Sequence, residues 1–123
     1  MRGLSSSVAI AGLAAVLASC GGSDDIASCT ISTPDEGGGT LTVCREIAKL
    51  PPAEQEFWAN SCVVSAKGAT ASFKPSPCPH ALALGGCRLT EQTITFWYYA
   101  GGPYEAADVP MLCAQLGATV VAP

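Results

Sequence analysis

The chain has 123 residues and a net charge of −4, and only 13% of its residues are charged. Its 6 basic residues form no cluster, which argues against nucleic-acid binding. A chain of this length has room for one small domain or two very small ones. A core of that size is marginal by itself, so we expect covalent cross-links to stabilise it.

The N-terminal stretch is typical of a signal peptide. Arg2 is the only charged residue before Asp24, and the run 8–18 (VAIAGLAAVLA) is entirely apolar or small. This is the length of a signal-peptide apolar region, and it is too short for a membrane span of roughly 20 residues. A buried core helix would carry polar residues on one face, and this run has none. The sequence therefore predicts a signal peptide over 1–19.

The end of this leader reads Leu17-Ala18-Ser19-Cys20. It resembles the lipobox of bacterial lipoproteins, and the resemblance covers about the first 21 residues. It implies that Cys20 is lipidated, that the leader is cut just before it and that the new N-terminus is acylated. Several acyl chains on one residue suffice for stable membrane attachment. An ordinary secreted protein cut at the small residues is the alternative.

The residue after Cys20 bears on the choice of membrane. In lipoproteins an Asp at this position favours retention at the inner membrane, and this chain has Gly21. The resemblance therefore favours the outer membrane. Residues 20–28 (CGGSDDIAS) are expected to form a lipidated polar tether, with the folded part beginning at Cys29.

Cysteine usage predicts a disulfide framework. The chain has 7 cysteines, and lipidation of Cys20 leaves an even six. Outside the cytoplasm, six cysteines in a small domain indicate three disulfides. Spacing alone leaves 15 connectivities open.

Two segments of the mature chain resemble each other. The tripeptide at 68–70 (GAT) recurs at 117–119, each time a few residues after a cysteine. Units 29–79 and 80–123 are each expected to run strand, strand, helix, strand, which predicts an α+β fold of two ββαβ-like units. The alternative is that two small units resemble each other by chance.

In the first unit we expect strands at 29–31, 40–47 and 69–73, where apolar and β-branched residues gather. A helix is expected to begin at 50–54, with prolines near its first position, and to end at Gly68.

In the second unit we expect strands at 87–89, 93–99 and 118–121. Asp108 is the expected N-cap of the second helix, with Pro110 in its first turn and Gly117 at its end. Helical spacing places four residues on one face, namely Val109, Leu112, Cys113 and Leu116.

Superposing the two units selects a disulfide pattern. Cys29 with Cys62 and Cys87 with Cys113 are the same strand-to-helix bridge made twice. The remaining two, Cys44 and Cys78, have no counterparts in the second unit, where Trp97 stands in place of Cys44. The repeat therefore predicts a third bond, Cys44–Cys78.

The sequence offers few candidates for catalytic or metal-binding residues. The chain has no C-x-x-C pair, which argues against both a zinc site and a redox motif. His80 is the only histidine and lies in a Pro/Cys-rich loop without a nucleophile motif. The acids at the two helix starts suit the helix dipole; they are Glu54, Glu56, Glu105 and Asp108. We therefore assign no catalytic residue, no metal and no cofactor.

An aromatic run at 96–99 (FWYY) supplies the candidate binding residues Trp97 and Tyr99, with Tyr104 after the following turn. Alternation puts Trp97 and Tyr99 on one face of the strand. That face is either core or an exposed surface suited to a carbohydrate or protein contact. Because Trp97 replaces a cysteine of the extra disulfide, we favour a packing role for it.

The sequence thus predicts a non-enzymatic envelope lipoprotein with a structural or binding role. Its partners are the membrane, through lipidated Cys20, and a protein or carbohydrate ligand, with no nucleic acid. The alternative is an inhibitor or toxin-like module whose loop 75–86 protrudes to engage a partner. A small hydrolase is a third hypothesis, and it would need a cleft holding two carboxylates.

Overall fold

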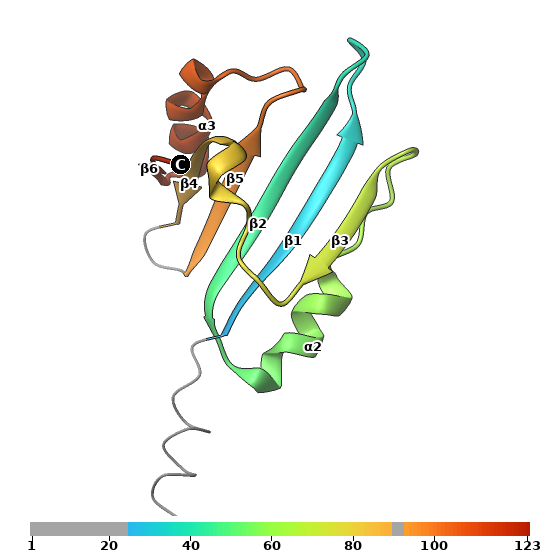
Figure 1. Ribbon diagram of the computed structural model, residues 1–123, viewed down its shortest axis with the longest axis vertical. Helices are drawn as coiled ribbons and strands as arrows, with labels where there is room; N and C mark the ends of the chain where they lie inside the picture. Colours follow the sequence, from blue (N-terminus) through green and yellow to red (C-terminus); the bar gives the residue numbers. More distant parts are fainter. Residues whose placement is uncertain (1–24, 90–92) are drawn as a thin grey trace, which may run out of the picture.

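The computed structural model describes residues 25–89 and 93–123 and shows a small α+β domain (Figure 1). The described part contains a six-stranded antiparallel sheet, two α-helices and three disulfide bonds. This confirms the predicted class, a disulfide-stapled α+β fold. The predicted signal peptide, Cys20 and residues 21–24 lie outside the described residues. None of the helices described is long and apolar enough to span a bilayer.

The strands run in the order β3-β1-β2-β5-β4-β6 across the sheet. In chain order the elements are β1 (Asp25–Pro34), β2 (Thr40–Leu50), α2 (Pro52–Ser61), β3 (Thr70–Lys74), β4 (Ala83–Arg88), β5 (Ile94–Tyr99), α3 (Val109–Leu116) and β6 (Thr119–Val121). Two short 3-10 turns, η1 (His80–Leu82) and η2 (Ala106–Asp108), precede β4 and α3. Every predicted strand and helix therefore has a counterpart, with shifted bounds.

Paired residues form two adjacent rows that cross all six strands. One row contains Phe73, Cys29, Arg45, Phe96, Cys87 and Val120. The next row contains Ser72, Thr30, Cys44, Trp97, Gly86 and Val121. Because side chains alternate along a strand, the two rows project from opposite faces of the sheet.

The disulfides show what each face carries. Cys29–Cys62 and Cys87–Cys113 attach the end of α2 and the body of α3 to the first row, which we call the helix face. Cys44–Cys78 attaches residues 75–82, the crossing segment, to the second row, which we call the crossing face. These are the three pairs that the sequence predicts. Each is expected to stabilise the domain by about 2–4 kcal/mol.

The start of the domain differs from the expectation. Residues 25–28 were expected to belong to the tether, yet β1 begins at Asp25. Ala27 is fully buried in a cluster with Ile47 and Leu50 of β2, and partly buried apolar side chains pack against it. Burial of Ala27 gives this segment a packed position in the sheet, so any tether ends before Asp25.

The two helices differ in how well they follow the prediction. In α3, a proline stands in the first turn and Gly117 ends the helix with a φ of 66°, as expected. In contrast, α2 ends at Ser61, and Gly68, with a φ of 78°, lies in the turn before β3. The reason is packing: α2 buries no side chain, and helices in proteins depend on packing for most of their stability.

Buried residues form three small clusters in place of one core. One surrounds Cys87–Cys113 beneath α3, a second joins β1 to the end of β2, and a third surrounds Cys44–Cys78 with Trp97 on the crossing face. Two of the three clusters therefore contain a disulfide, which fits a domain too small for a large continuous core.

Candidate functional site

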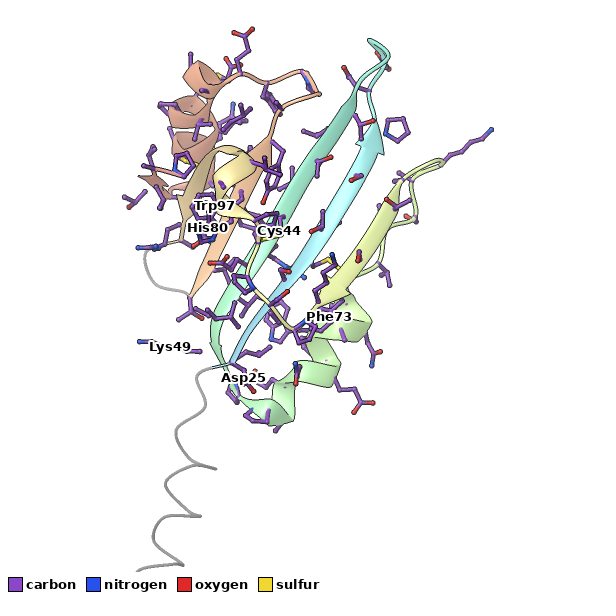
Figure 2. The ribbon with its side chains drawn as sticks, in the orientation of Figure 1. Asp25, Cys44, Lys49, Phe73, His80 and Trp97 are labelled. Carbon is purple, nitrogen blue, oxygen red and sulfur yellow. A yellow bond between two sulfur atoms is a disulfide. The ribbon has the colours of Figure 1, made fainter. Side chains whose placement is uncertain are left out.

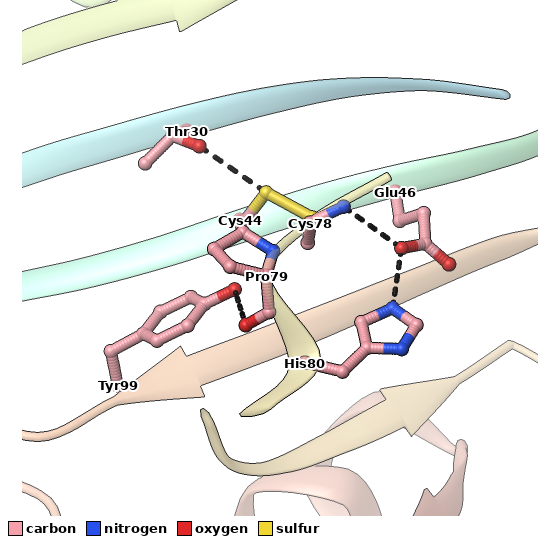
Figure 3. A network of polar contacts seen from close by, with 7 residues as sticks. All are labelled: Thr30, Cys44, Glu46, Cys78, Pro79, His80 and Tyr99. Carbon is pink, nitrogen blue, oxygen red and sulfur yellow. Dashed lines mark hydrogen bonds and ion pairs between the residues drawn. A yellow bond between two sulfur atoms is a disulfide. The ribbon is translucent and has the colours of Figure 1, made fainter. Parts of the chain in front are cut away.

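The crossing segment passes over the sheet between β3 and β4 (Figure 1), and several contacts hold it there (Figure 3). Besides the disulfide, the backbone N–H of Cys78 donates a hydrogen bond to Oε1 of Glu46 at 3.0 Å. The hydroxyl of Tyr99 donates to the carbonyl oxygen of Pro79 at 3.1 Å. Burial raises the pKa of Tyr99, and the Glu46 carboxylate raises it further, so the hydroxyl remains a donor at neutral pH.

His80 connects this segment to the centre of the sheet. Its Nε2 lies 2.7 Å from Oε1 of Glu46, and its ring stacks on Trp97 at a centroid distance of 4.1 Å. Figure 2 shows His80 and Trp97 together near Cys44. Trp97 also packs on Gly86, where an added Cβ would lie 2.9 Å from the indole ring. The sequence suggested only a loop histidine, whereas the contacts of His80 with Glu46 and Trp97 help to hold the crossing segment on the sheet.

The chemistry available to the Glu46–His80 pair is limited. In residues 25–89 and 93–123 the imidazole has Glu46 as its one side-chain hydrogen-bond partner, and no hydroxyl or thiol joins the pair. A Ser-His-Asp arrangement requires a nucleophile beside the histidine. The same residues contain no cluster of three or more His, Cys, Asp or Glu side chains suited to a metal ion. The geometry therefore supports a structural role for this pair.

The three aromatic binding candidates do not form one surface. Trp97 is only 3% exposed, so its ring is not available to a ligand and acts in packing. Tyr99 is half-buried beside the crossing segment. Tyr104 packs edge-on against Tyr98 in the cluster beneath α3, with ring centroids 6.2 Å apart. The structure therefore does not bring the three candidates together, because Tyr104 packs in the cluster beneath α3 and Trp97 and Tyr99 lie on the opposite face of the sheet.

The helix face has a different centre. The two disulfides that attach the helices start from β1 and β4, and the paired residues Arg45 and Phe96 lie between them on β2 and β5. A hollow of about 100 Å³ opens here, lined by Cys29, Ile31, Val43, Arg45 and Phe96. We call it the central groove. Most of its lining is apolar, and Arg45 is the only charged side chain among these residues.

Arg45 has an unusual environment for a cation. Its Nε is buried and has no hydrogen-bond partner, and no acid within the described ranges forms an ion pair with it. Its Cζ lies 5.0 Å from the ring centroid of Trp58, in a cation–π contact. Burial lowers the pKa of the guanidinium, although an arginine stays charged at neutral pH. Arg45 is half-buried and part of its guanidinium is desolvated, so it is suited to an anionic group from outside the domain.

Sequence reasoning missed Arg45, although a signal was present. Alternate residues of the predicted second strand are Leu41, Val43, Arg45 and Ile47, so one charge interrupts an otherwise apolar face. That pattern places a cation on the side of the strand expected to face the core. The contact between Arg45 and Trp58 was not predictable, because it depends on where α2 rests on the sheet.

Comparisons with models of known families, with curated protein sequences and with solved structures find no match to this chain. Inferences about function therefore depend on the sequence of the leader and on the geometry of the two faces.

Proposed function

We propose that this protein is a bacterial envelope lipoprotein whose domain binds another protein without catalysing a reaction. The observation that carries the binding role is the central groove, an apolar hollow whose one charged lining residue, Arg45, lacks a partner among the described residues. The cores of protein interfaces are enriched in aromatic residues and arginine and depleted in other charges. A protein ligand therefore fits the groove better than the carbohydrate that the sequence left open.

The sequence of the leader supports the membrane anchor. Lipidation at Cys20 would place the first acyl chain five residues before Asp25, where β1 begins. An extended chain spans at most about 3.6 Å per residue, so the start of β1 would lie within roughly 18 Å of the lipidated residue. Figure 2 shows Asp25 near Lys49 at one end of the sheet, which would be the membrane-proximal end. Gly21 favours the outer membrane.

The inhibitor hypothesis has less support. It requires a protruding loop at 75–86, but residues 75–82 cross over the sheet, where Cys78 is bonded to Cys44, and residues 83–86 belong to β4 (Figure 1). Leu82, in η1, is 75% exposed and is the one large apolar side chain that this region presents. A hydrolase would need a nucleophile beside His80, and Glu46 is the only acid bonded to that ring in the part of the chain that the structure describes.

We also infer that the domain arose from two ββαβ units. The sheet order β3-β1-β2-β5-β4-β6 reads the same from either edge when units β1-β2-α2-β3 and β4-β5-α3-β6 are exchanged. Equivalent disulfides attach each helix to the first strand of its unit. Cys44 and Trp97, which the repeat treats as equivalent, pair directly where the two units meet.

Labelling with a fatty-acid analogue tests the anchor. In bacteria that express the full chain, we expect the wild-type protein to incorporate the label and to sediment with membranes. Cys20→Ala should do neither, because the acceptor thiol is absent. Ser19→Ala is the matched control, since it keeps a small residue before Cys20 and should be labelled normally. Labelling of Cys20→Ala at the wild-type level would refute lipidation at this residue.

A further inference from the structure

We propose that the central groove binds an Asp or Glu side chain of a partner protein, presented among apolar residues, with Arg45 as its counter-ion. The proposal rests on the binding role inferred above and names the chemistry of the partner. It combines two observations on one face of the sheet, a cation without an acidic partner among the described residues and an apolar hollow around it.

The charge of Arg45 is only partly compensated within the described part of the domain. A half-buried guanidinium loses part of its hydration, and the domain compensates only with the face of Trp58. A carboxylate accepts two parallel N–H bonds from a guanidinium, which is a stronger interaction than a neutral hydrogen bond. The cation–π contact with Trp58 restrains the guanidinium, so less conformational freedom is lost when the anion binds.

The size of the central groove limits what it can hold. Pockets for small-molecule ligands usually measure about 300–1,000 Å³. The central groove measures about 100 Å³, which suits one side chain and is too small for a sugar or a long acyl chain. The carboxylate would therefore belong to a larger molecule that rests on the surface. Ile31, Val43 and Phe96, all partly exposed, supply the apolar contacts around it.

A competing explanation is that Arg45 only attaches α2 to the sheet through Trp58. The helix buries no side chain of its own, so this contact matters to its position. However, Cys29–Cys62 fixes the end of the same helix covalently. Arg45→Met keeps a long side chain against Trp58 and removes only the charge, so it separates the two roles.

The test uses protein purified from bacterial envelopes as expressed from the full chain, immobilised through a biotin tag after Pro123. This design works whether or not Cys20 is lipidated, so failure of the anchor and failure of the groove are distinguishable. A random 12-residue peptide library is selected on the wild-type protein. The selected peptides are then titrated against Arg45→Met, Arg45→Lys and the matched control Arg88→Met, which alters an exposed arginine of β4.

We expect the selected peptides to contain Asp or Glu beside apolar residues. Affinity should fall about tenfold or more with Arg45→Met, as for other desolvated charge pairs, and should not change with Arg88→Met. The affinity of Arg45→Lys should lie between those of Arg45→Met and Arg88→Met, because an ammonium lacks the bidentate geometry of a guanidinium. Replacing the peptide acid with its amide should reproduce the Arg45→Met loss.

Three results would overturn the proposal. One is selected peptides without an acid, and another is equal affinity for the wild type and Arg45→Met. The third is Arg45-dependent binding to vesicles of anionic phospholipid without binding to any peptide, which would assign the groove to a lipid head group. Intact-peptide mapping of Cys29–Cys62 and thermal unfolding of Arg45→Met check that the variant is folded. If it is not, the Arg45→Lys and peptide-amide comparisons decide the question.

Discussion

Cys44 and Arg45 are neighbours in β2, yet they belong to faces of the sheet with opposite properties. On the crossing face, Cys44 is fully buried, bonded to Cys78 and covered by the crossing segment. On the helix face, Arg45 lies between two helices that are attached on either side and leave the middle of the sheet uncovered. The comparison shows that the crossing segment covers one face around Cys44 and Trp97, whereas the helices leave the centre of the other face uncovered at Arg45. Four stability predictions test this difference, from the largest expected effect to the smallest.

Truncating neighbouring aromatic residues of β5 should affect the two faces unequally. Trp97→Ala removes a buried side chain from the crossing face and should lower the free energy of unfolding by about 3–5 kcal/mol. Phe96→Ala removes a partly exposed ring from the central groove, and about 1 kcal/mol is expected. Urea unfolding measures both values. Equal losses would mean that the helix face is as closed as the crossing face.

Removing the crossing disulfide should have the next largest effect. In the double variant Cys44→Ala/Cys78→Ala, we expect a loss of about 2–4 kcal/mol, because the unfolded chain is no longer closed into a loop. Exchange of backbone amides in the crossing segment should accelerate more than exchange in α3. If the helices were released instead, the assignment of this bond to the crossing face would be wrong.

A smaller effect is expected from Gly86→Ala. The added Cβ would lie 2.9 Å from the Trp97 ring, so the indole or the strand must shift, at a cost of about 1–3 kcal/mol. Gly37→Ala is the matched control, because its Cβ would meet only the Asp35 side chain at 3.2 Å. Thermal unfolding of the two variants should differ by several degrees. An unchanged melting temperature for Gly86→Ala would show that Trp97 is not tightly packed there.

The smallest effect is expected for the contact between His80 and Glu46. The histidine side chain is 43% exposed, so solvent screening should limit the coupling energy to below about 1 kcal/mol. A double-mutant cycle with His80→Phe and Glu46→Gln measures that coupling, since Phe retains the stack on Trp97. His80→Ala should cost more than His80→Phe. Equal losses for the two variants would mean that the contact with Glu46, and not the stacked ring, holds His80 in place.

Local patterns and the resemblance between residues 29–79 and 80–123 were enough to predict the strands, the second helix and the disulfide pairs. Alternation in β5 also predicted that Trp97 and Tyr99 share a face, but it could not show that residues 75–82 cover it. That arrangement depends on Cys44–Cys78, which joins positions 34 residues apart. It also brings His80 to Glu46, a contact that no local pattern indicates.

Expectations failed where tertiary packing decides the outcome. The start of β1 was missed because Ala27 is small and gives no strong strand signal, while its burial comes from Ile47 and Leu50 of the next strand. The first helix was predicted too long because Gly68 resembles a helix terminator, and the absence of buried residues on α2 is not apparent from its sequence. Arg45 was missed because a single charge on a strand face does not show whether it is paired, which depends on its neighbours in the fold.

The central claim is that the helix face binds a partner at Arg45, whereas the crossing segment covers the other face around Cys44 and Trp97. A selected acidic peptide is added to the ¹⁵N-labelled protein, and NMR follows the chemical shifts of the backbone amides and of Arg45 Nε–H. This titration tests the claim directly. We predict that the largest shifts occur at Arg45, Ile31, Val43 and Phe96, with little change at Cys44, Trp97 and Tyr99. Shifts concentrated on the crossing face, or an unshifted Arg45 Nε–H at saturating peptide, would contradict the account.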